Sequence, residues 1–182
     1  MAYITTGVEY GLHCLLYLIG PRDEAHPVSA RDLADLQGVP IEYVAKLFTK
    51  LRKAGLVRAL EGARGGFQLA RKPKLISVLD VIVAIDGEKA IFECREIRGR
   101  CAVFDGRPPA WATRGVCSIH AIMIEADARM REVLAAHTLA DITASVAAKA
   151  SPNFSGEIAK WLANKAPGSR RARQHRSSNE GE

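Results

Sequence analysis

Apolar residues in the first half of the chain recur at the spacing of α-helices, with one interruption of a different kind. That interruption is a pair of short apolar runs, 56–60 and 67–70, which flank a glycine-rich turn and predict a β-hairpin. Two helices joined by a turn and followed by a hairpin form a winged helix-turn-helix, which we place at residues 28–70. The helical spacing predicts four helices, over residues 5–19, 30–36, 41–54 and 77–85.

The predicted helices begin and end at residues that favour helix ends for physical reasons. Ser29 is placed to accept a hydrogen bond from the first turn of the second helix, where Asp32 also favours the positive end of the helix dipole. Residues 38–40 form a turn, and Pro40 suits the first position of the following helix. Gly55 ends that helix, because glycine readily adopts the left-handed conformation found there.

The second half of the chain contains an irregular region and one long helix. Residues 88–116 lose periodicity, which predicts a loop. A long helix follows over 117–136, then a helix from Thr138 toward Lys149 and a short amphipathic turn within 151–166. The fold class is therefore mainly α with a small β-hairpin wing. We divide the chain into a winged part, a cysteine-bearing loop, long helices and a largely disordered basic extension, at residues 1–87, 88–117, 118–150 and 151–182.

Positive charge is concentrated in the predicted winged helix-turn-helix. The chain has a formal net charge of +6, from 26 Lys and Arg against 20 Asp and Glu. Residues 28–74 hold ten basic and four acidic side chains, so the remaining residues balance to zero. A local basic region of this kind is the electrostatic footprint of a protein that binds nucleic acid.

The order of the predicted helices and hairpin indicates which residues of this region contact DNA. A recognition helix needs polar donors on its outer face, and glycines let a wing approach a phosphate strand while an arginine at its tip enters the minor groove. Each lysine alone is more simply interpreted as an ordinary solvated side chain. The arrangement of all these residues along two helices and a hairpin favours DNA binding. The predicted contacts are Ser29, Tyr43, Lys46, Thr49, Lys50, Arg52, Lys53, Arg64, Gly65 and Gly66.

We expect a cytoplasmic protein with no membrane partner. Glu9 and His13 interrupt what would be the apolar centre of a signal peptide, and the longest apolar stretch, 12–19, is far too short to span a bilayer. In the cytoplasm, four cysteines are more often ligands, redox switches or core residues than structural disulfides.

Three cysteines and one histidine form the candidate sensing site: Cys94-x6-Cys101-x15-Cys117, with His120 three residues on. Thiolates suit soft metals and iron–sulfur clusters, and a loop can converge them. A thiol–disulfide switch and a zinc site stay open, as does a simple helix-start role for His120. Cys14 lies in an apolar stripe and is a predicted core residue. Cys117 and His120 lack a third orienting group, so we expect no Cys/His enzyme.

Several segments together resemble one bacterial family of transcription regulators, the IscR/NsrR (Rrf-two) family. The match extends over about residues 3–145. It implies a homodimer, joined by the long 117–136 helix, on a roughly palindromic double-stranded DNA operator, and repression is the expected action. The segments that carry the resemblance are 7–10, 29–34, 43–57, 65–67 and 79–82.

The same resemblance implies an iron–sulfur cluster on the loop, because Cys117 and His120 match the last two ligands of IscR-like members. A two-iron cluster is favoured and a four-iron cluster stays open. Operator affinity would then respond to iron, redox or nitric oxide status. Other members take a ligand from the partner subunit's first helix, which here points to Glu9 or His13, four residues apart on one helix face.

Three positions and one spacing depart from the family pattern. Ala45 and Lys46 replace the Glu and Gln of IscR, so the operator sequence differs, and Glu61 replaces a basic residue before the wing. The gap between Cys101 and Cys117 is about ten residues longer than usual. A regulator of the same fold that is controlled by a protein partner, with no cofactor, is a further alternative.

Overall fold

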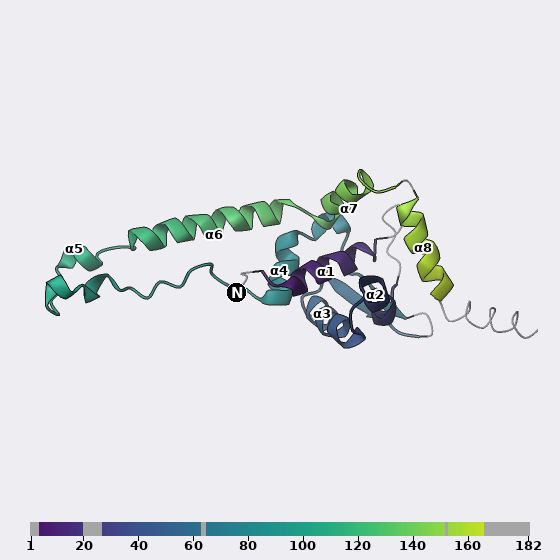
Figure 1. Cartoon of the computed structure of the whole chain (residues 1–182), viewed down its shortest axis with the longest axis horizontal. Helices are drawn as coiled ribbons and strands as arrows, with labels where there is room; N and C mark the ends of the chain where they lie inside the picture. The colour runs from purple at the N-terminus through teal and green to yellow at the C-terminus, as the bar shows by residue number, and fades with distance from the viewer. Residues whose placement is uncertain (1–3, 20–26, 63–64, 152, 166–182) are drawn as a thin grey trace, which may run out of the picture.

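The computed structural model describes residues 4–19, 27–62, 65–151 and 153–165 (Figure 1). They form a mainly helical protein with one two-stranded antiparallel hairpin, which confirms the predicted fold class. In chain order the elements are α1 (Thr6–Leu16), α2 (Ala30–Gln37), α3 (Ile41–Lys53), β1 (Val57–Leu60), β2 (Gly66–Leu69), η2 (Pro73–Leu75), α4 (Val78–Asp86), η3 (Arg98–Arg100), η4 (Ala102–Phe104), α5 (Ala110–Thr113), α6 (Ser118–Ala136), α7 (Leu139–Ala147) and α8 (Phe154–Lys165).

The helix-turn-helix forms where the local signals predict it. The N–H of Asp32 donates to Ser29 Oγ at 3.1 Å and so caps α2. Gly38 ends α2 with a φ of 65°, in the left-handed region that glycine adopts without strain. Pro40 precedes the first residue of α3 rather than occupying it. The stripe that α3 buries is the predicted one: Val44, Leu47, Phe48 and Leu51.

The hairpin of β1 and β2, which we call the wing, is attached to the core at its base. Its strands pair in antiparallel register over their whole length. Phe67 also bridges Val28, the residue before the α2 cap, through two backbone hydrogen bonds of 2.8 and 2.9 Å. The Phe67 ring packs on Phe48 of α3, with centroids 4.6 Å apart. The wing and α3 therefore share one apolar core.

That core lies between α1, α3 and α4, and α7 closes it. Gly11 lets α1 approach α4 closely, because a Cβ there would lie 2.3 Å from Ile85 Cδ1. Leu139 of α7 is fully buried, and its N–H donates to a carbonyl in the segment before α4 at 2.9 Å. Beside it, Ser77 and Thr138 pair in a β-bridge, and each forms a capping box at the start of its helix.

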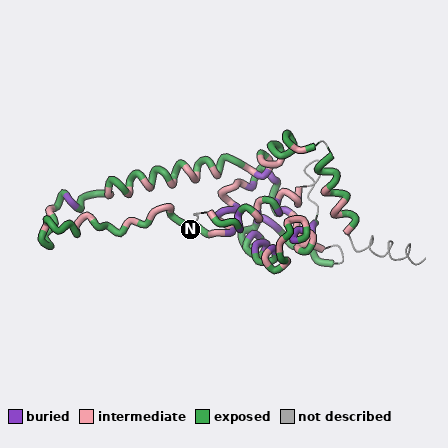
Figure 2. The backbone as a smooth tube through the Cα atoms, viewed as in Figure 1, coloured by how far each residue is buried: buried purple, intermediate pink, exposed green. Residues whose placement is uncertain are grey.

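Residues 88–117, which we call the cysteine arm, lead away from this core, and α6 returns to it (Figure 1). The arm was predicted to be a loop, and the structure adds three short helices, η3, η4 and α5. No residue of α6 is fully buried, and the arm is mostly exposed or half-buried (Figure 2). The arm and α6 thus project together from the winged part.

The last described element is longer than the short turn that the sequence pattern predicts. α8 has 12 residues, so the extension is helical up to Lys165. Residues 166–182, predicted to be disordered, lie outside the described residues. None of the described helices is both long and apolar enough to cross a membrane. The half-buried residues of α8 fall on one face: Ile158, Trp161, Leu162 and Lys165.

The Leu139→Ala variant tests the packing that closes the core. It removes a fully buried side chain, so we expect the free energy of unfolding to fall by about 2–5 kcal/mol. Urea unfolding followed by circular dichroism measures the change. Leu75→Ala is the matched control, because Leu75 is 60% exposed and we expect a change within about 0.5 kcal/mol. Equal losses in the two variants would contradict this packing.

Candidate nucleic-acid interface and cysteine arm

α3 presents an exposed basic surface. Lys46, Arg52 and Lys53 are all exposed, and the last turn of the helix is rich in cations, which the helix dipole favours. Arg58, at the start of the wing, is also exposed. Exposed cations along one helix and the adjacent strand are suited to contacts with phosphates.

Besides Ser29, which caps α2, three of the predicted DNA contacts have partners within the chain. Tyr43 is half-buried, with its ring edge-on to Tyr10 of α1 and the centroids 5.5 Å apart. Thr49 donates its hydroxyl to a backbone carbonyl one turn back in α3 at 2.8 Å. Lys50 donates its ammonium to the carbonyl of Ile85, near the end of α4. Their DNA contacts stay predictions, and Tyr43 and Lys50 also help to hold α3 against α1 and α4.

The wing glycines are required by the chain's own backbone. A Cβ on Gly66 would lie 2.7 Å from the carbonyl carbon of Val28, and one on Gly65 would lie 2.4 Å from the carbonyl oxygen of Leu60. This requirement is separate from the predicted approach to a phosphate strand. Arg64, predicted to lie at the wing tip, is outside the described residues.

Arg98 ties the two sides of the cysteine arm together. Its guanidinium donates to the carbonyls of residues 113, 114 and 115 at 3.4, 3.3 and 2.9 Å, and it forms a two-point ion pair with Glu96. The segment after Cys94 is thereby held against the segment before Cys117. Sequence analysis missed this pair. Its signal is a pair of opposite charges between two cysteines, but the three carbonyls come from a distant part of the arm.

Cys94, Cys117 and His120 lie within the electrostatic reach of this ion pair. The pKa of Arg98 is raised, first by its hydrogen bond to Glu96 and further by the nearby thiols of Cys117 and Cys94. The pKa of Glu96 is lowered, first by the hydrogen bond from Arg98 and to a smaller extent by His120. Two of the three predicted thiol ligands therefore lie near Arg98, and the imidazole of His120, in the first turn of α6, lies near Glu96.

Cys101 is the most exposed thiol of the arm. It is exposed between η3 and η4, whereas the other two thiols of the arm are half-buried. Three thiols and an imidazole suit a soft metal or a cluster by their chemistry. In the described parts of the chain, however, no three His, Cys, Asp or Glu side chains are placed to hold a metal ion. The described part of one chain therefore contains the residue types that ligate a metal, but it does not bring three of them together.

The residues that lengthen the gap after Cys101 form a small packed unit at the tip of the arm. Phe104 meets Trp111 edge-on, with the ring centroids 5.9 Å apart. Beside Trp111, Ala112 is buried, with 6% of its surface exposed. The long segment between Cys101 and Cys117 therefore contains short helices and a ring contact, and it is not wholly irregular.

The remaining candidate ligands lie on α1. Glu9 and His13 are both exposed, so a partner subunit can approach them, and their role as ligands stays a prediction. Cys14 is fully buried, which confirms its predicted place in the core. Burial raises the pKa of the Cys14 thiol to about 12.

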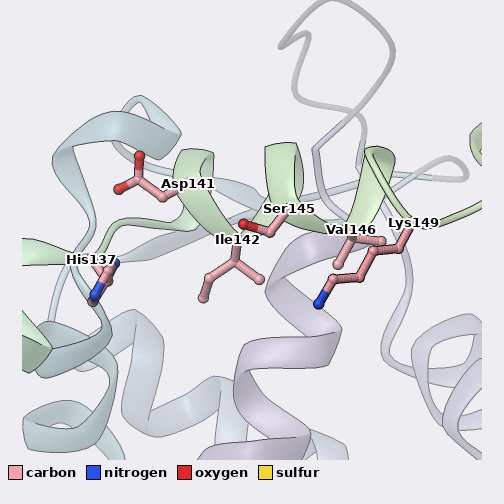
Figure 3. A pocket seen from close by; sticks show the side chains of 6 residues that line it. All are labelled: His137, Asp141, Ile142, Ser145, Val146 and Lys149. Carbon is pink, nitrogen blue, oxygen red and sulfur yellow. The ribbon is translucent and has the colours of Figure 1, made fainter.

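A shallow open hollow of about 300 Å³ lies along α7 (Figure 3). Thr138 holds Asp141 at its edge in the capping box, and their hydrogen bond lowers the pKa of this carboxyl. We assign the hollow no part in the site, because its lining includes neither a cysteine nor a predicted DNA contact. The lining residues are His137, Asp141, Ile142, Ser145, Val146 and Lys149.

Thiol reactivity distinguishes Cys14 from Cys101. At pH 8 we expect iodoacetamide to modify Cys101 in the folded protein and to leave Cys14 intact, because the thiolate is the reactive form and burial keeps Cys14 protonated. Mass spectrometry of the peptides measures both. Both cysteines should react in urea, which is the control.

The same raised pKa makes stability depend on pH. The Cys14 thiol loses its proton above pH 9.0 in the unfolded chain but only near pH 12 in the folded protein, so the free energy of unfolding falls as the pH rises above 9.0.

The Arg98→Ala variant tests the link across the cysteine arm. We expect faster amide hydrogen exchange in residues 88–117, because three carbonyls lose their donor. Arg100→Ala is the matched control, since Arg100 is an exposed arginine in the same turn and should leave the exchange unchanged. Identical exchange in the Arg98 variant and the parent protein would exclude this link.

Comparison with known proteins places the winged part and the arm in one family. A sequence model of the Rrf2 family, described as iron-dependent transcriptional regulator, matches residues 4–145. Protein rrf2 of Nitratidesulfovibrio vulgaris is 36% identical over 154 residues, covering 84% of this chain and 95% of that protein. The regulator IscR of Aliivibrio salmonicida is 41% identical over 73 residues, covering 40% of this chain and 44% of that protein.

Two solved structures have the same fold over most of their length. CymR, the global cysteine regulator of B. subtilis, superposes with a TM-score of 0.61 at 25% identity, over 80% of this chain and 98% of that one. IscR of T. potens gives a TM-score of 0.56 at 27% identity, over 80% and 88%. Together with the exposed basic α3 and its wing, these matches show that the chain belongs to the Rrf2 family of winged-helix transcriptional regulators.

Proposed function

We propose that this regulator binds its operator with an affinity set by an iron–sulfur cluster on the cysteine arm, which responds to iron, redox or nitric oxide status. The observation that carries the proposal is that Cys94 and Cys117 lie near Arg98, while His120 lies near Glu96 and its ring packs on Phe92 of the arm, with centroids 5.9 Å apart. Thiolates are the form of cysteine that binds iron.

The cluster would be held by the thiolates of Cys94, Cys101 and Cys117, with His120 or the partner subunit's Glu9 or His13 as the fourth ligand. When bound, such a cluster supplies a centre that iron loss, oxidation or nitric oxide can alter. The likeness to the IscR regulators supports this assignment. A two-iron cluster is favoured over a four-iron one by the resemblance alone.

The DNA-binding form in this proposal is a homodimer on a roughly palindromic operator, acting as a repressor. α6 supports it, because it projects from the core and leaves large apolar side chains in solvent. Ile119, Ile122 and Val133 are 61%, 65% and 58% exposed and fall on one helix face, where a second α6 can cover them. Two copies would then present two α3 helices to successive major grooves.

A direct path of contacts leads from the arm to α3. The arm begins directly after α4. Near the end of α4, the carbonyl of Ile85 accepts a hydrogen bond from the ammonium of Lys50 in α3. Asp86 accepts hydrogen bonds from the backbone N–H and the hydroxyl of Thr5, at 2.8 and 2.6 Å, and so fixes the start of α1. A change of state in the arm that moves the end of α4 would therefore shift the population of α3 positions that fit the operator.

A thiol switch without a cluster is the second candidate. It is favoured by the exposure of Cys101, and by the finding that no three potential ligands among the described residues are placed to hold a metal ion. An oxidised form of Staphylococcus aureus CymR is among the structures of this fold, with a TM-score of 0.54 at 26% identity. In this mechanism oxidation of Cys101, rather than loss of a cluster, would change operator affinity.

Purification without air, with an absorption spectrum and counts of iron and sulfide, separates the two candidates. We expect a coloured protein, and Cys101→Ala should lose the chromophore while keeping some DNA binding. Cys14→Ala is the matched control and should keep the colour, because Cys14 lies in the core. A full-intensity spectrum in the Cys101 variant would contradict the ligand assignment. A colourless parent protein whose operator affinity falls with diamide would favour the thiol switch.

A further inference from the structure

The tip of the cysteine arm leaves large apolar side chains in solvent. We call residues 102–113, which contain η4 and α5, the arm tip. Val103 and Trp111 of the arm tip are 86% and 72% exposed. The contact of Phe104 with Trp111, whose ring centroids lie 5.9 Å apart, holds η4 against α5. Tryptophan is enriched at the centres of protein–protein interfaces, where its burial contributes much of the binding free energy. The arm tip is therefore a suitable surface for a protein partner.

The hollow along α7 offers apolar side chains of its own. Ile142 and Val146 lie one helical turn apart and line it, and Asp141 lies at its edge (Figure 3). Ile142 is half-buried, and Val146 is 40% exposed. The volume of about 300 Å³ is at the lower limit for protein pockets that bind small ligands, so the hollow has room for one or two side chains. An apolar side chain from another molecule can therefore be covered there.

α6 lies between these two places. The arm tip precedes α6 and α7 follows it, so they lie at opposite ends of this helix (Figure 1). The 19 residues of α6 span about 28 Å, and the arm tip therefore cannot reach the hollow of its own chain. When two α6 helices pair in antiparallel directions, the start of each lies beside the end of the other. The arm tip of one protomer then lies beside α7 of its partner.

The apolar residues of α6 are compatible with the antiparallel arrangement. Ile119, Ala126 and Val133 are exposed and recur every seven residues, so they lie on one face of the helix. Ala126 is equally far from the other two along the helix. Two antiparallel helices that cross at Ala126 therefore bring each Ile119 beside Val133 of the partner subunit, and both are covered.

Charge on the cysteine arm opposes the parallel arrangement. Residues 95–116 contain five arginines and two acidic residues, which is a net charge of +3. A parallel pair would bring two such segments together, whereas an antiparallel pair separates them by about the length of α6. The Debye length at physiological salt is about 8 Å, so this separation removes most of the repulsion. In the antiparallel pair each positive segment instead approaches Asp141 of the partner subunit.

We propose that the arm tip of each protomer docks in the α7 hollow of its partner, where Val103 and Trp111 cover Ile142 and Val146. Two-fold symmetry makes this contact twice, so both arms are held in the dimer. The arm, which is mostly exposed or half-buried in a single chain, is then supported by the second copy rather than by its own core. The inference rests on the homodimer of the proposed function and involves neither the cluster nor DNA.

Tryptophan fluorescence tests this contact, because the chain has two tryptophans and the Trp161→Phe variant keeps Trp111 alone. We expect the dimer of this variant to emit at a shorter wavelength than a monomer made by adding Ile122→Asp, since docking removes the indole from water. Ile122 is 65% exposed, so the aspartate disrupts the pairing of α6 without entering the core. Analytical ultracentrifugation gives the oligomeric state of each sample. Equal emission from dimer and monomer would overturn the proposal.

A matched pair of variants tests whether the hollow is the docking site. In the Trp161→Phe background, Val146→Asp places a charge in the hollow and should shift the emission of the dimer to a longer wavelength. Ala144→Asp adds the same charge at an exposed position of α7 outside the lining and should leave the emission unchanged. Equal emission from these two variants would exclude the hollow. If the parent protein were a monomer at every concentration, the homodimer and this contact would both fail, whereas a dimer with exposed Trp111 would exclude this contact alone.

Discussion

The rest of the structure depends on the junction where the chain returns from the arm to the core. The N–H of Val78 donates to the carbonyl of His137 at 2.8 Å, and the N–H of Leu139 donates to the carbonyl of Ile76 at 2.9 Å. These two bonds join the start of α4 to the start of α7. Full burial of Leu139 then excludes water from the pair, which strengthens it. The arm and α6 can therefore project into solvent while both of their ends remain fixed.

This junction separates the roles of two groups of elements. α1 to α4 and the wing form one packed unit, in which Phe67, Phe48 and Val28 hold the wing against α3. The arm and α6 contain little buried surface and cannot be stable alone. Their apolar side chains gain burial only against another molecule. An element with low intrinsic stability, attached at both ends to a stable DNA-binding unit, is able to change conformation without unfolding that unit.

Most of the fold could be predicted from the sequence because its signals are local. Ser29, Gly38 and Gly55 mark helix ends through bonds and torsions within a few residues, and the α3 stripe follows from the 3.6-residue period. The bridge from Phe67 to Val28 and the docking of α8 on Asp35 could not be predicted, because they join segments far apart in the chain. Local patterns carry no information about such pairs.

For the candidate site, the sequence supplies the ligand types and leaves their arrangement open. The three cysteines and His120 could be named from spacing and resemblance. The clamp by Arg98 could not, since its acceptors are backbone carbonyls that any residue provides. The folded tip of the arm, where Phe104 packs on Trp111, could not be predicted either. No local sequence pattern indicates whether the extra residues between Cys101 and Cys117 form an irregular loop or pack against one another.

The energetic effect of the long gap after Cys101 can be divided between chain entropy and packing. Loop-closure entropy grows only with the logarithm of length, so tripling a short loop costs about 1 kcal/mol. That cost is too small to prevent Cys101 from joining Cys94 and Cys117. The packing of Phe104 on Trp111 adds a contribution of the same size, because aromatic pairs add about 0.5–1.5 kcal/mol beyond the area they bury. Chain entropy and ring packing therefore oppose the approach of Cys101 to the other two thiols by comparable amounts, and neither alone fixes where Cys101 lies.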